Sequence, residues 1–349
     1  MENRLVVFDW MRTVGIFMIL FHHLPKYYLG LQNLDQDNID INLLSFYELN
    51  RYFSLGLFVF ISGYLINQKR QRFLNSKSLL KFFYKKIIRV FPLYYLALIA
   101  FIYIYHVFDP VYIIIHILGL QLLFVSATFS ALPTLWFIGL IVIYYSLFMI
   151  LNYQPIKPIY KIFLILFFPI LMVTLGLYFQ ITDLKIILYY FTFLFGILSA
   201  EILFFESQLW QKINLIIPVL FGFIFLLSFF IFREYGLKNI HPIYAYLLIN
   251  IIQLVFILFI YKICNSLSRK FPSAKLVNLI AYSSYCMYLF HRPLWFLMVS
   301  IMQNKLQIAN QNLILFILIC LGLPLLIILS YFLQRFYDKY FMRLADRLN

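Results

Sequence analysis

Residues 4–23, RLVVFDWMRTVGIFMILFHH, place the ionisable side chains of Asp9, Arg12, His22 and His23 inside an apolar run long enough to span a membrane. A charged side chain at the centre of a bilayer costs about 2.5–3.5 kcal/mol or more. Ionisable residues within a span therefore indicate a functional site, unless they lie at the helix end and reach the interface.

As a helix, this segment aligns Arg12 with His23. The two are eleven residues apart, close to three helical turns, so both side chains point the same way. His22 lies about 100° away, which favours His23 as the working imidazole. The helical rise separates Arg12 from His23 by about 16 Å. We therefore expect them to serve two ends of one long ligand, or two different ligands.

The composition indicates a polytopic membrane protein. Of 349 residues, 64% are hydrophobic and 12% are charged, against about half and a quarter in soluble proteins. Apolar runs of about twenty residues predict an all-α helical bundle and not a β-barrel. We assign the net charge of +15 to cytoplasmic loops and contacts with anionic membrane lipids, not to nucleic acid. The first run lacks a small-residue cleavage site, so it is expected to be a retained helix.

Loop charges predict the orientation of eleven candidate spans. Residues 69–89 hold eight Lys and Arg residues and no acid, which predicts a cytoplasmic loop, whereas residues 30–51 hold four acids and one Arg. Both termini are cytoplasmic if one candidate does not cross. Segment 111–126 is short, follows Pro110 and contains His116, so we expect it to be re-entrant or interfacial on the outer side, which leaves ten crossings. The candidates are 6–28, 52–68, 87–106, 111–126, 134–152, 160–180, 186–204, 213–232, 243–262, 279–301 and 312–333.

Three later segments add candidate site residues. Ser62 and Gly63 are small and allow helices to approach closely, so packing explains them without other evidence. Lys86 and Arg89 are three residues apart on one helix face, and two cations there suit a phosphate-bearing ligand. Trp136 begins a span near the outer interface, where an anchoring role is more common than stacking against a substrate.

His291 and Arg292 lie in mid-span beside Pro293, where a helix can kink. Two adjacent ionisable groups at that depth indicate an aqueous cavity, because each needs a partner or water. We find no metal-ligand spacing, Walker loop, Rossmann glycine pattern or nucleophile elbow, so a metal site is not expected. The three cysteines are far apart and predict neither a disulfide framework nor a metal site.

These fragments together resemble the acyltransferase-3 family of integral membrane acyltransferases. Arg12 and His23 match the family's first-helix pattern of an Arg, ten residues and a His, preceded here by Asp9 and Trp10. LFVFISGYL resembles its aromatic-rich Ser-Gly segment, KKIIRVFPLYY its basic pair before a proline, and SSYCMYLFHRPL its late His-x-Pro segment. The four matches occur in order and cover the whole chain.

The chain departs from the family pattern at two positions. Lys86 stands where the family usually has Arg. Many members carry a Glu five residues after the Trp, and here that position is Ile141. This difference puts in doubt any mechanism that needs that carboxylate.

The resemblance implies one membrane-embedded acyltransferase domain over residues 1–349, without the soluble extracytoplasmic domain that is fused to some members. It implies transfer of an acyl group, usually acetyl, from acyl-CoA on the cytoplasmic side to a hydroxyl of a cell-surface carbohydrate or lipid-linked glycan. The expected location is a bacterial plasma membrane. Acyl-CoA is then a donor substrate, and no permanently bound cofactor is expected.

The resemblance also suggests roles for the candidate residues. We expect Arg12, Lys86 and Arg89 to bind the phosphates of CoA. His23 and Arg12 are the expected catalytic residues, with His23 acting as general base or carrying the acyl group briefly. The acceptor, or the oxyanion of the reaction, is expected to be bound by Trp136, His291 and Arg292. Supporting roles are expected for Asp9, which would orient Arg12, and for His22, Ser62 and Gly63.

Two other classes of protein fit part of the sequence. A polysaccharide or glycolipid exporter or flippase would also place His and Arg residues at mid-membrane. We find no inverted repeat and no matched pair of interrupted helices, which such transporters often carry. A structural or assembly protein would leave the Arg12–His23 stripe and the His291–Arg292 pair unexplained.

Overall fold

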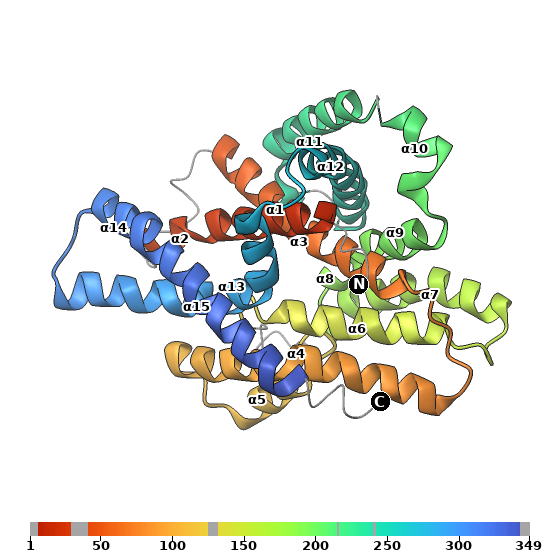
Figure 1. Ribbon diagram of the computed structural model, residues 1–349, viewed down its shortest axis with the longest axis horizontal. Helices are drawn as coiled ribbons and strands as arrows, with labels where there is room; N and C mark the ends of the chain where they lie inside the picture. The colour runs from red at the N-terminus through yellow and green to blue at the C-terminus, as the bar shows by residue number, and fades with distance from the viewer. Residues whose placement is uncertain (1–5, 29–40, 125–131, 215, 240–241, 343–349) are drawn as a thin grey trace.

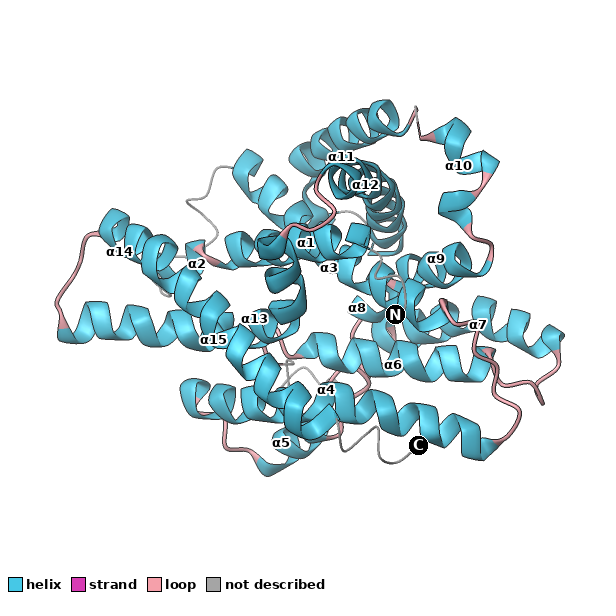
Figure 2. Ribbon diagram, in the orientation of Figure 1, coloured by secondary structure: helices cyan, strands magenta, loops and turns pink. Residues whose placement is uncertain are grey.

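The computed structural model describes residues 6–28, 41–124, 132–214, 216–239 and 242–342, and its regular elements over these ranges are helices (Figure 2). Within the same ranges, the β-type pairing consists of an isolated bridge between Phe73 and Tyr153. The all-α class predicted from the long apolar runs is therefore confirmed.

The helices are labelled along the chain in Figure 1. The first half contains α1 (Val6–His23), α2 (Pro25–Tyr28), α3 (Ile41–Asn67), α4 (Ser76–Tyr105), α5 (Pro110–Ile117), α6 (Trp136–Leu151) and α7 (Pro158–Leu177). The second half contains α8 (Lys185–Leu188), α9 (Tyr190–Glu201), η2 (Phe204–Glu206), α10 (Gln208–Ile213), α11 (Ile217–Asn239), α12 (Pro242–Lys270), α13 (Lys275–Ser300), η3 (Ile301–Lys305), α14 (Gln311–Ile317), η4 (Leu318–Gly322), α15 (Leu323–Tyr337) and η5 (Asp338–Met342).

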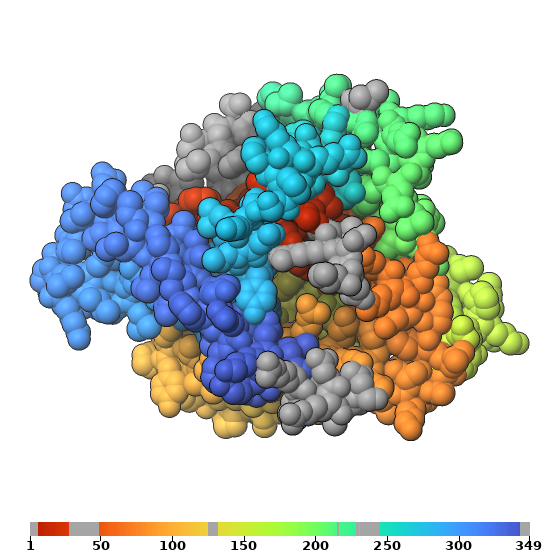
Figure 3. Space-filling model, viewed as in Figure 1, coloured from red at the N-terminus to blue at the C-terminus, as the bar shows by residue number. Residues whose placement is uncertain are grey.

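Helix α1 lies at the centre of the bundle. It packs against α3, α12 and α13 (Figure 1), and in the space-filling view it is visible only between the surfaces of its neighbours (Figure 3). Met11 and Ile16 of α1 are fully buried. A helix that carries four ionisable residues is thus largely surrounded by protein, which lowers the cost of placing them within a bilayer.

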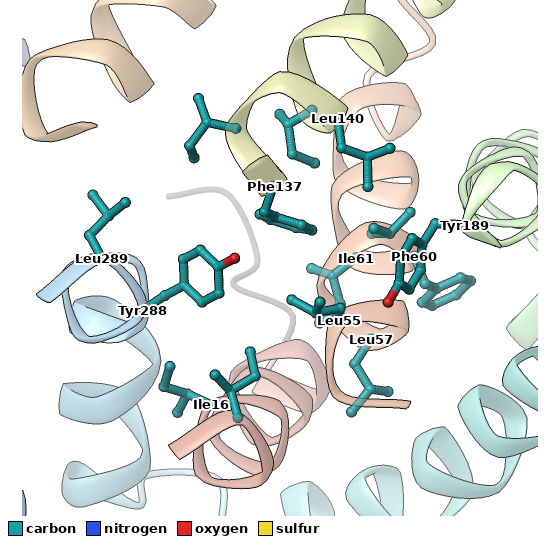
Figure 4. Close-up of a cluster of buried hydrophobic side chains, with 14 of the residues drawn as sticks. Ile16, Leu55, Leu57, Phe60, Ile61, Phe137, Leu140, Tyr189, Tyr288 and Leu289 are labelled. Carbon is teal, nitrogen blue, oxygen red and sulfur yellow. The ribbon is translucent and has the colours of Figure 1, made fainter. Parts of the chain in front are cut away.

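The core beside α1 is apolar and joins four helices. Buried side chains from α1, α3, α6 and α13 meet there, among them Ile16, Leu55, Phe137 and Tyr288 (Figure 4). The Tyr288 hydroxyl donates a 2.6 Å hydrogen bond to the carbonyl of Thr134, just before α6. This bond ties the middle of α13 to the first turn of α6.

The bundle has two ends, and the first residues of α1 lie at the end that carries the basic segment. Helices α1 and α3 are antiparallel, because Phe8 packs 4.7 Å from Tyr64 whereas Asn50 donates to the carbonyl of Met18. The start of α1 is therefore at the same end as the chain that follows α3. We call this the basic end, after the Lys and Arg residues at 69–89.

The start of α13 and the last turns of α15 also lie at the basic end. Thr13 of α1 donates to the carbonyl of Val277, in the first turn of α13. The hydroxyl of Tyr337, at the end of α15, donates to the carbonyl of Ile88 in α4. This common end is the arrangement expected if residues 69–89 and both termini share one side of the membrane.

Five helices in the described ranges are long and apolar enough to cross a membrane: Leu49–Asn67, Ser76–Tyr105, Pro158–Leu177, Tyr244–Lys270 and Gln311–Met342. Helix α7 shows the lipid-facing pattern most clearly, because much of its apolar surface, including Phe163 and Leu166, is exposed. Helix α1 is not among the five, because its ionisable residues lower its mean hydropathy. The count of ten crossings therefore stays a prediction.

The non-crossing segment predicted at 111–126 corresponds in part to α5. This helix has eight residues and is about 12 Å long, too short to cross a bilayer. Asp109 caps its first turn by accepting a hydrogen bond from the backbone N–H of Tyr112. Residues 125–131 and the acidic stretch at 30–40 lie outside the described residues.

The prediction that residues 69–89 form a loop was wrong for most of that segment, because α4 begins at Ser76. Asn75 caps this helix: its side chain accepts from the N–H of Ser78, and the Ser78 hydroxyl lies 3.4 Å from the N–H of Asn75. The lysines that follow are good helix formers. Lys86 and Arg89 therefore stand on a long helix that continues through Pro92 to Tyr105.

Helices α3 and α9 cross at very short range through two glycines. A Cβ atom added at Gly63 would lie 2.4 Å from the carbonyl oxygen of Phe193, and one added at Gly196 would lie 2.4 Å from that of Phe60. Both helices meet backbone to backbone, as small residues allow in membrane bundles. This contact explains Gly63 by packing.

We predict that Gly63→Ala destabilises the protein, because the added methyl group has to displace the α9 backbone. Overpacking of this kind costs about 1–3 kcal/mol. Thermal unfolding of purified protein in detergent measures the effect as a lower midpoint. Gly222→Ala is the matched control, since no atom of the described residues lies within 4 Å of its added Cβ. An unchanged midpoint for Gly63→Ala relative to this control would contradict the close crossing.

Candidate active site

His23, His291 and Arg292 meet where the last turn of α1 packs against the middle of α13. The rings of His23 and His291 stack with centroids 5.2 Å apart and an interplanar angle of 16°. Nη2 of Arg292 lies 3.0 Å from Nδ1 of His23. His291 is fully buried and Arg292 is 7% exposed. We call these three residues the histidine–arginine cluster.

Parallel packing of α1 on α13 produces the histidine–arginine cluster. Thr13 contacts Val277 at one end of the pair, and His23 contacts His291 at the other. The two residues of α13 are 14 positions apart, so the cluster lies about 21 Å along this helix from the basic end. The cluster thus joins residues that are 268 positions apart in the sequence.

Hydrogen-bond partners define the tautomer of each histidine. A guanidinium group has only donors, so Arg292 donates to Nδ1 of His23, and the proton of that ring is on Nε2. Nδ1 of His291 lies 2.8 Å from the carbonyl oxygen of Tyr288 and 3.2 Å from that of Met287. Carbonyl oxygens only accept, so His291 carries its proton on Nδ1. The two stacked rings are therefore opposite tautomers.

The surroundings of the cluster are aromatic and buried. The Trp295 ring packs edge-on against His291 at 5.4 Å and against Tyr27 at 5.7 Å. The Tyr27 hydroxyl interacts with Arg292 and with Tyr105. Nε2 of His291, Nε of Arg292 and Nε1 of Trp295 are buried polar atoms near the cluster that have no hydrogen-bond partner among the described residues. The site therefore offers one acceptor and two donors to a bound polar group.

His22 lies next to the cluster without belonging to the stack. Its ring packs edge-on against His23 at 4.8 Å, and its side chain is buried. The rotation of about 100° between successive helical residues turns His22 away from His291. Of the two histidines, His23 is the one that the fold brings to Arg292.

Arg12 and Asp9 lie toward the basic end of α1. Their side chains approach to 3.5 Å, three residues apart on one face, with Asp9 buried and Arg12 partly exposed. Among the contacts of the described residues, none joins Arg12 to His23, in keeping with their axial separation of about 16 Å. The pair therefore cannot act on the same atoms as the histidine–arginine cluster.

Lys86 lies at the basic end beside two aromatic rings. Its Nζ is 5.1 Å from the Phe82 ring centroid and 5.4 Å from that of Tyr145. The Tyr145 hydroxyl lies 2.8 Å from that of Ser62, so α3, α4 and α6 converge on this lysine. Arg89 is exposed one turn further along α4. Lys86 is therefore held in place by aromatic rings, whereas Arg89 is open to solvent.

Trp136 begins α6 and lies apart from the cluster. Nζ of Lys185 is 5.6 Å from the Trp136 ring centroid, and the Tyr189 ring stacks at 6.2 Å. None of the contacts described for Trp136 reaches His23 or His291. Ile141, where the family often has a carboxylate, is buried in the apolar interior of α6.

Sequence reasoning missed Tyr27, Tyr145 and Trp295. Trp295 follows His291 by four residues on α13, so helical periodicity places the two on one face and could have identified it. Tyr27 and Tyr145 carry no such signal, because their positions depend on how separate helices pack. Within the described ranges, no group of three His, Cys, Asp or Glu residues could hold a metal ion.

Comparison with known families decides the class of protein. The acyltransferase-3 family model, described as an acyltransferase domain, matches residues 5–335. The chain belongs to the acyltransferase-3 family. Membership implies a membrane-embedded acyltransferase, and the resemblance seen in the sequence is confirmed. No curated protein and no solved structure matches the chain.

A polar network at the basic end holds the chain between α3 and α4. Glu201, the last residue of α9, accepts a 2.6 Å hydrogen bond from Arg72 and a 2.9 Å hydrogen bond from Asn67. Arg72 also donates to Asn152, just after α6, at 2.6 Å. This network links the ends of α3, α6 and α9 to the segment that leads into α4, the helix that carries Lys86.

We predict that Glu201→Ala loosens residues 68–75. Losing about 1 kcal/mol of local stability raises the open population about fivefold. Limited trypsin digestion of detergent-solubilised protein should therefore cleave after Arg70 or Arg72 about five times faster, with the thermal midpoint little changed. Glu206→Ala, at an exposed position close by, is the control. Equal cleavage rates in the two variants would argue against the network.

Proposed function

We propose that this protein is a membrane O-acyltransferase that moves an acyl group, acetyl in the simplest case, from cytoplasmic acyl-CoA to a hydroxyl of a cell-surface carbohydrate or lipid-linked glycan. The observation that carries the proposal is the histidine–arginine cluster: His23, His291 and Arg292 in mutual contact inside an apolar helical bundle. Ionisable groups at such a position are costly and mark a functional site.

The chemistry of acyl transfer matches the polar groups of the cluster. Attack of a hydroxyl on a thioester requires a base to take the hydroxyl proton and donors to stabilise the oxyanion that forms. The cluster supplies an unpartnered imidazole nitrogen on His291 and N–H donors on His23 and Arg292. These groups are held by the packing of two helices, so little reorganisation is needed at the moment of reaction.

The basic end supports acyl-CoA as the donor. Arg12, Lys86 and Arg89 lie toward this end, and the histidine–arginine cluster lies further along α1, where that helix meets the middle of α13. CoA is an elongated carrier with its phosphates at one end and its thioester at the other. Cations at the basic end suit the phosphates, and the separation of about 16 Å along α1 leaves room for the pantetheine arm to bring the thioester to His23.

We predict that His23→Ala lowers acyl transfer by about 100-fold or more, because it removes both the N–H donor and the partner of Arg292. The measurement is incorporation of radiolabel from acetyl-CoA into membrane glycans, at matched protein levels. His106→Asn is the control, since His106 is exposed at a left-handed helix cap that Asn also tolerates. Full activity in His23→Ala would remove this residue from the mechanism.

We predict that Lys86→Gln and Arg89→Gln each weaken acetyl-CoA binding about three- to tenfold, since each removes a charged donor to phosphate. Binding to purified protein should show this loss for acetyl-CoA but not for S-acetylpantetheine, which lacks the phosphates. Lys212→Gln, an exposed lysine on α10, is the control. A wild-type protein that binds no acyl-CoA would instead favour the exporter or flippase alternative.

A further inference from the structure

The two histidines of the cluster are not equivalent as bases. His23 accepts from Arg292 at Nδ1, so its Nε2 carries a proton and can only donate. His291 donates from Nδ1 to the carbonyls of Tyr288 and Met287, so Nε2 of its neutral ring carries a lone pair. In this arrangement, the only imidazole nitrogen of the cluster that can receive a proton is Nε2 of His291.

Different contacts hold the two tautomers in place. Nδ1 of His291 bonds to carbonyls three and four residues earlier in its own helix, so its orientation follows from the backbone of α13. His23 is the last residue of α1, and Arg292 is the partner that orients its ring. Reversing the His23 tautomer would point an N–H group at a guanidinium donor, which costs the hydrogen bond and leaves two donors facing each other.

A bound hydroxyl group would complement the buried polar atoms around Nε2 of His291. This nitrogen belongs to a fully buried residue and has no hydrogen-bond partner within the described ranges. Nε of Arg292 and Nε1 of Trp295 are donors that are likewise buried without a partner among the described residues. The Trp295 ring packs edge-on against His291, with the ring centroids 5.4 Å apart. A hydroxyl group both donates and accepts, so one hydroxyl can satisfy His291 together with one of these donors.

We propose that His291 is the general base that deprotonates the acceptor hydroxyl, and that His23 donates from Nε2 to the carbonyl oxygen of the thioester. This assignment rests on the proposed acyltransferase function and reverses the expectation that His23 is the base. Arg292 is a positioning residue for His23, because it acts through Nδ1 of that ring.

In the proposed reaction, the acyl group moves from the thioester sulfur to the acceptor oxygen. The acceptor O–H bond breaks as its proton passes to Nε2 of His291, and the acceptor oxygen bonds to the carbonyl carbon. The carbonyl electron pair moves onto oxygen, which accepts from Nε2–H of His23. When the carbonyl re-forms, the C–S bond breaks and the CoA thiolate takes the proton from His291. The products are the ester and the CoA thiol, and both histidines regain their starting forms.

The first test asks whether His291 acts as the general base, by comparing an acceptor that needs a base with one that does not. His291→Asn keeps an amide donor near Nδ1 and removes the Nε2 lone pair. We expect transfer from acetyl-CoA to membrane glycans to fall about 100-fold or more, with unchanged affinity for acetyl-CoA. Hydroxylamine needs no base before it attacks, so formation of acetohydroxamate by this variant should stay within a fewfold of wild type. His291→Gln, which also lacks the lone pair, should behave in the same way.

The second test concerns His23. An amide N–H of Gln can replace the Nε2–H donor, so His23→Gln should retain about a tenth or more of wild-type transfer. His23→Ala has no donor and should lose about 100-fold or more, with both glycan and hydroxylamine as acceptors. If His23 were the base or carried the acyl group, Gln and Ala would be equally inactive.

These outcomes distinguish failure of the His291 assignment from failure of the proposed acyltransferase function. The assignment of His291 is overturned if either of its variants transfers to glycans at a rate within a fewfold of wild type, or loses glycan and hydroxylamine acylation equally. It is also overturned if His23→Gln binds acetyl-CoA normally and is as inactive as His23→Ala. Failure of the acyltransferase proposal itself looks different, because wild-type protein would then neither bind acetyl-CoA nor acylate any acceptor.

Discussion

The hydrogen bond from Arg292 to His23 is the interaction on which the site depends. A guanidinium group remains charged under any condition that a protein meets, so burying it between helices requires a partner that accepts. His23 provides one, and the bond joins the end of α1 to the middle of α13. Because Arg292 has no acceptor of its own, the same bond determines which nitrogen of His23 carries the proton.

The rest of the bundle makes this burial possible. Helix α1 is surrounded by α3, α12 and α13, so its ionisable residues face protein over much of its length. Close crossings elsewhere, such as that of α3 and α9 through Gly63 and Gly196, bring neighbouring helices together backbone to backbone. The outermost surfaces, including most of α7, are apolar and suit lipid. The ionisable side chains of His291 and Arg292 thus lie inside the protein, whereas apolar side chains cover the outer surface of α7.

The candidate site residues form two regions that are separated along the helix axes. The basic end holds cations on α1 and α4, and the polar network around Glu201 fastens the chain that leads into α4. The histidine–arginine cluster lies further along α1, where that helix meets α13, among the aromatic rings of Tyr27, Tyr105 and Trp295. A ligand with phosphates at one end and a reactive thioester at the other can engage both regions at once. Neither region alone would require so long a path through the bundle.

The sequence by itself determined the helical class and the family, and it selected His23 as a candidate site residue, because hydrophobic run length and helical spacing are local properties. It also identified His291 and Arg292 as unusual, since ionisable groups in a span stand out in any apolar run. It misjudged where α4 begins, because the Asn75 cap outweighs the charges that follow. Only the tertiary structure decided that His23 meets Arg292 and His291, because that contact joins helices about 270 residues apart. It also decided which nitrogen of each ring carries the proton, because no local pattern records which carbonyl or guanidinium group faces an imidazole.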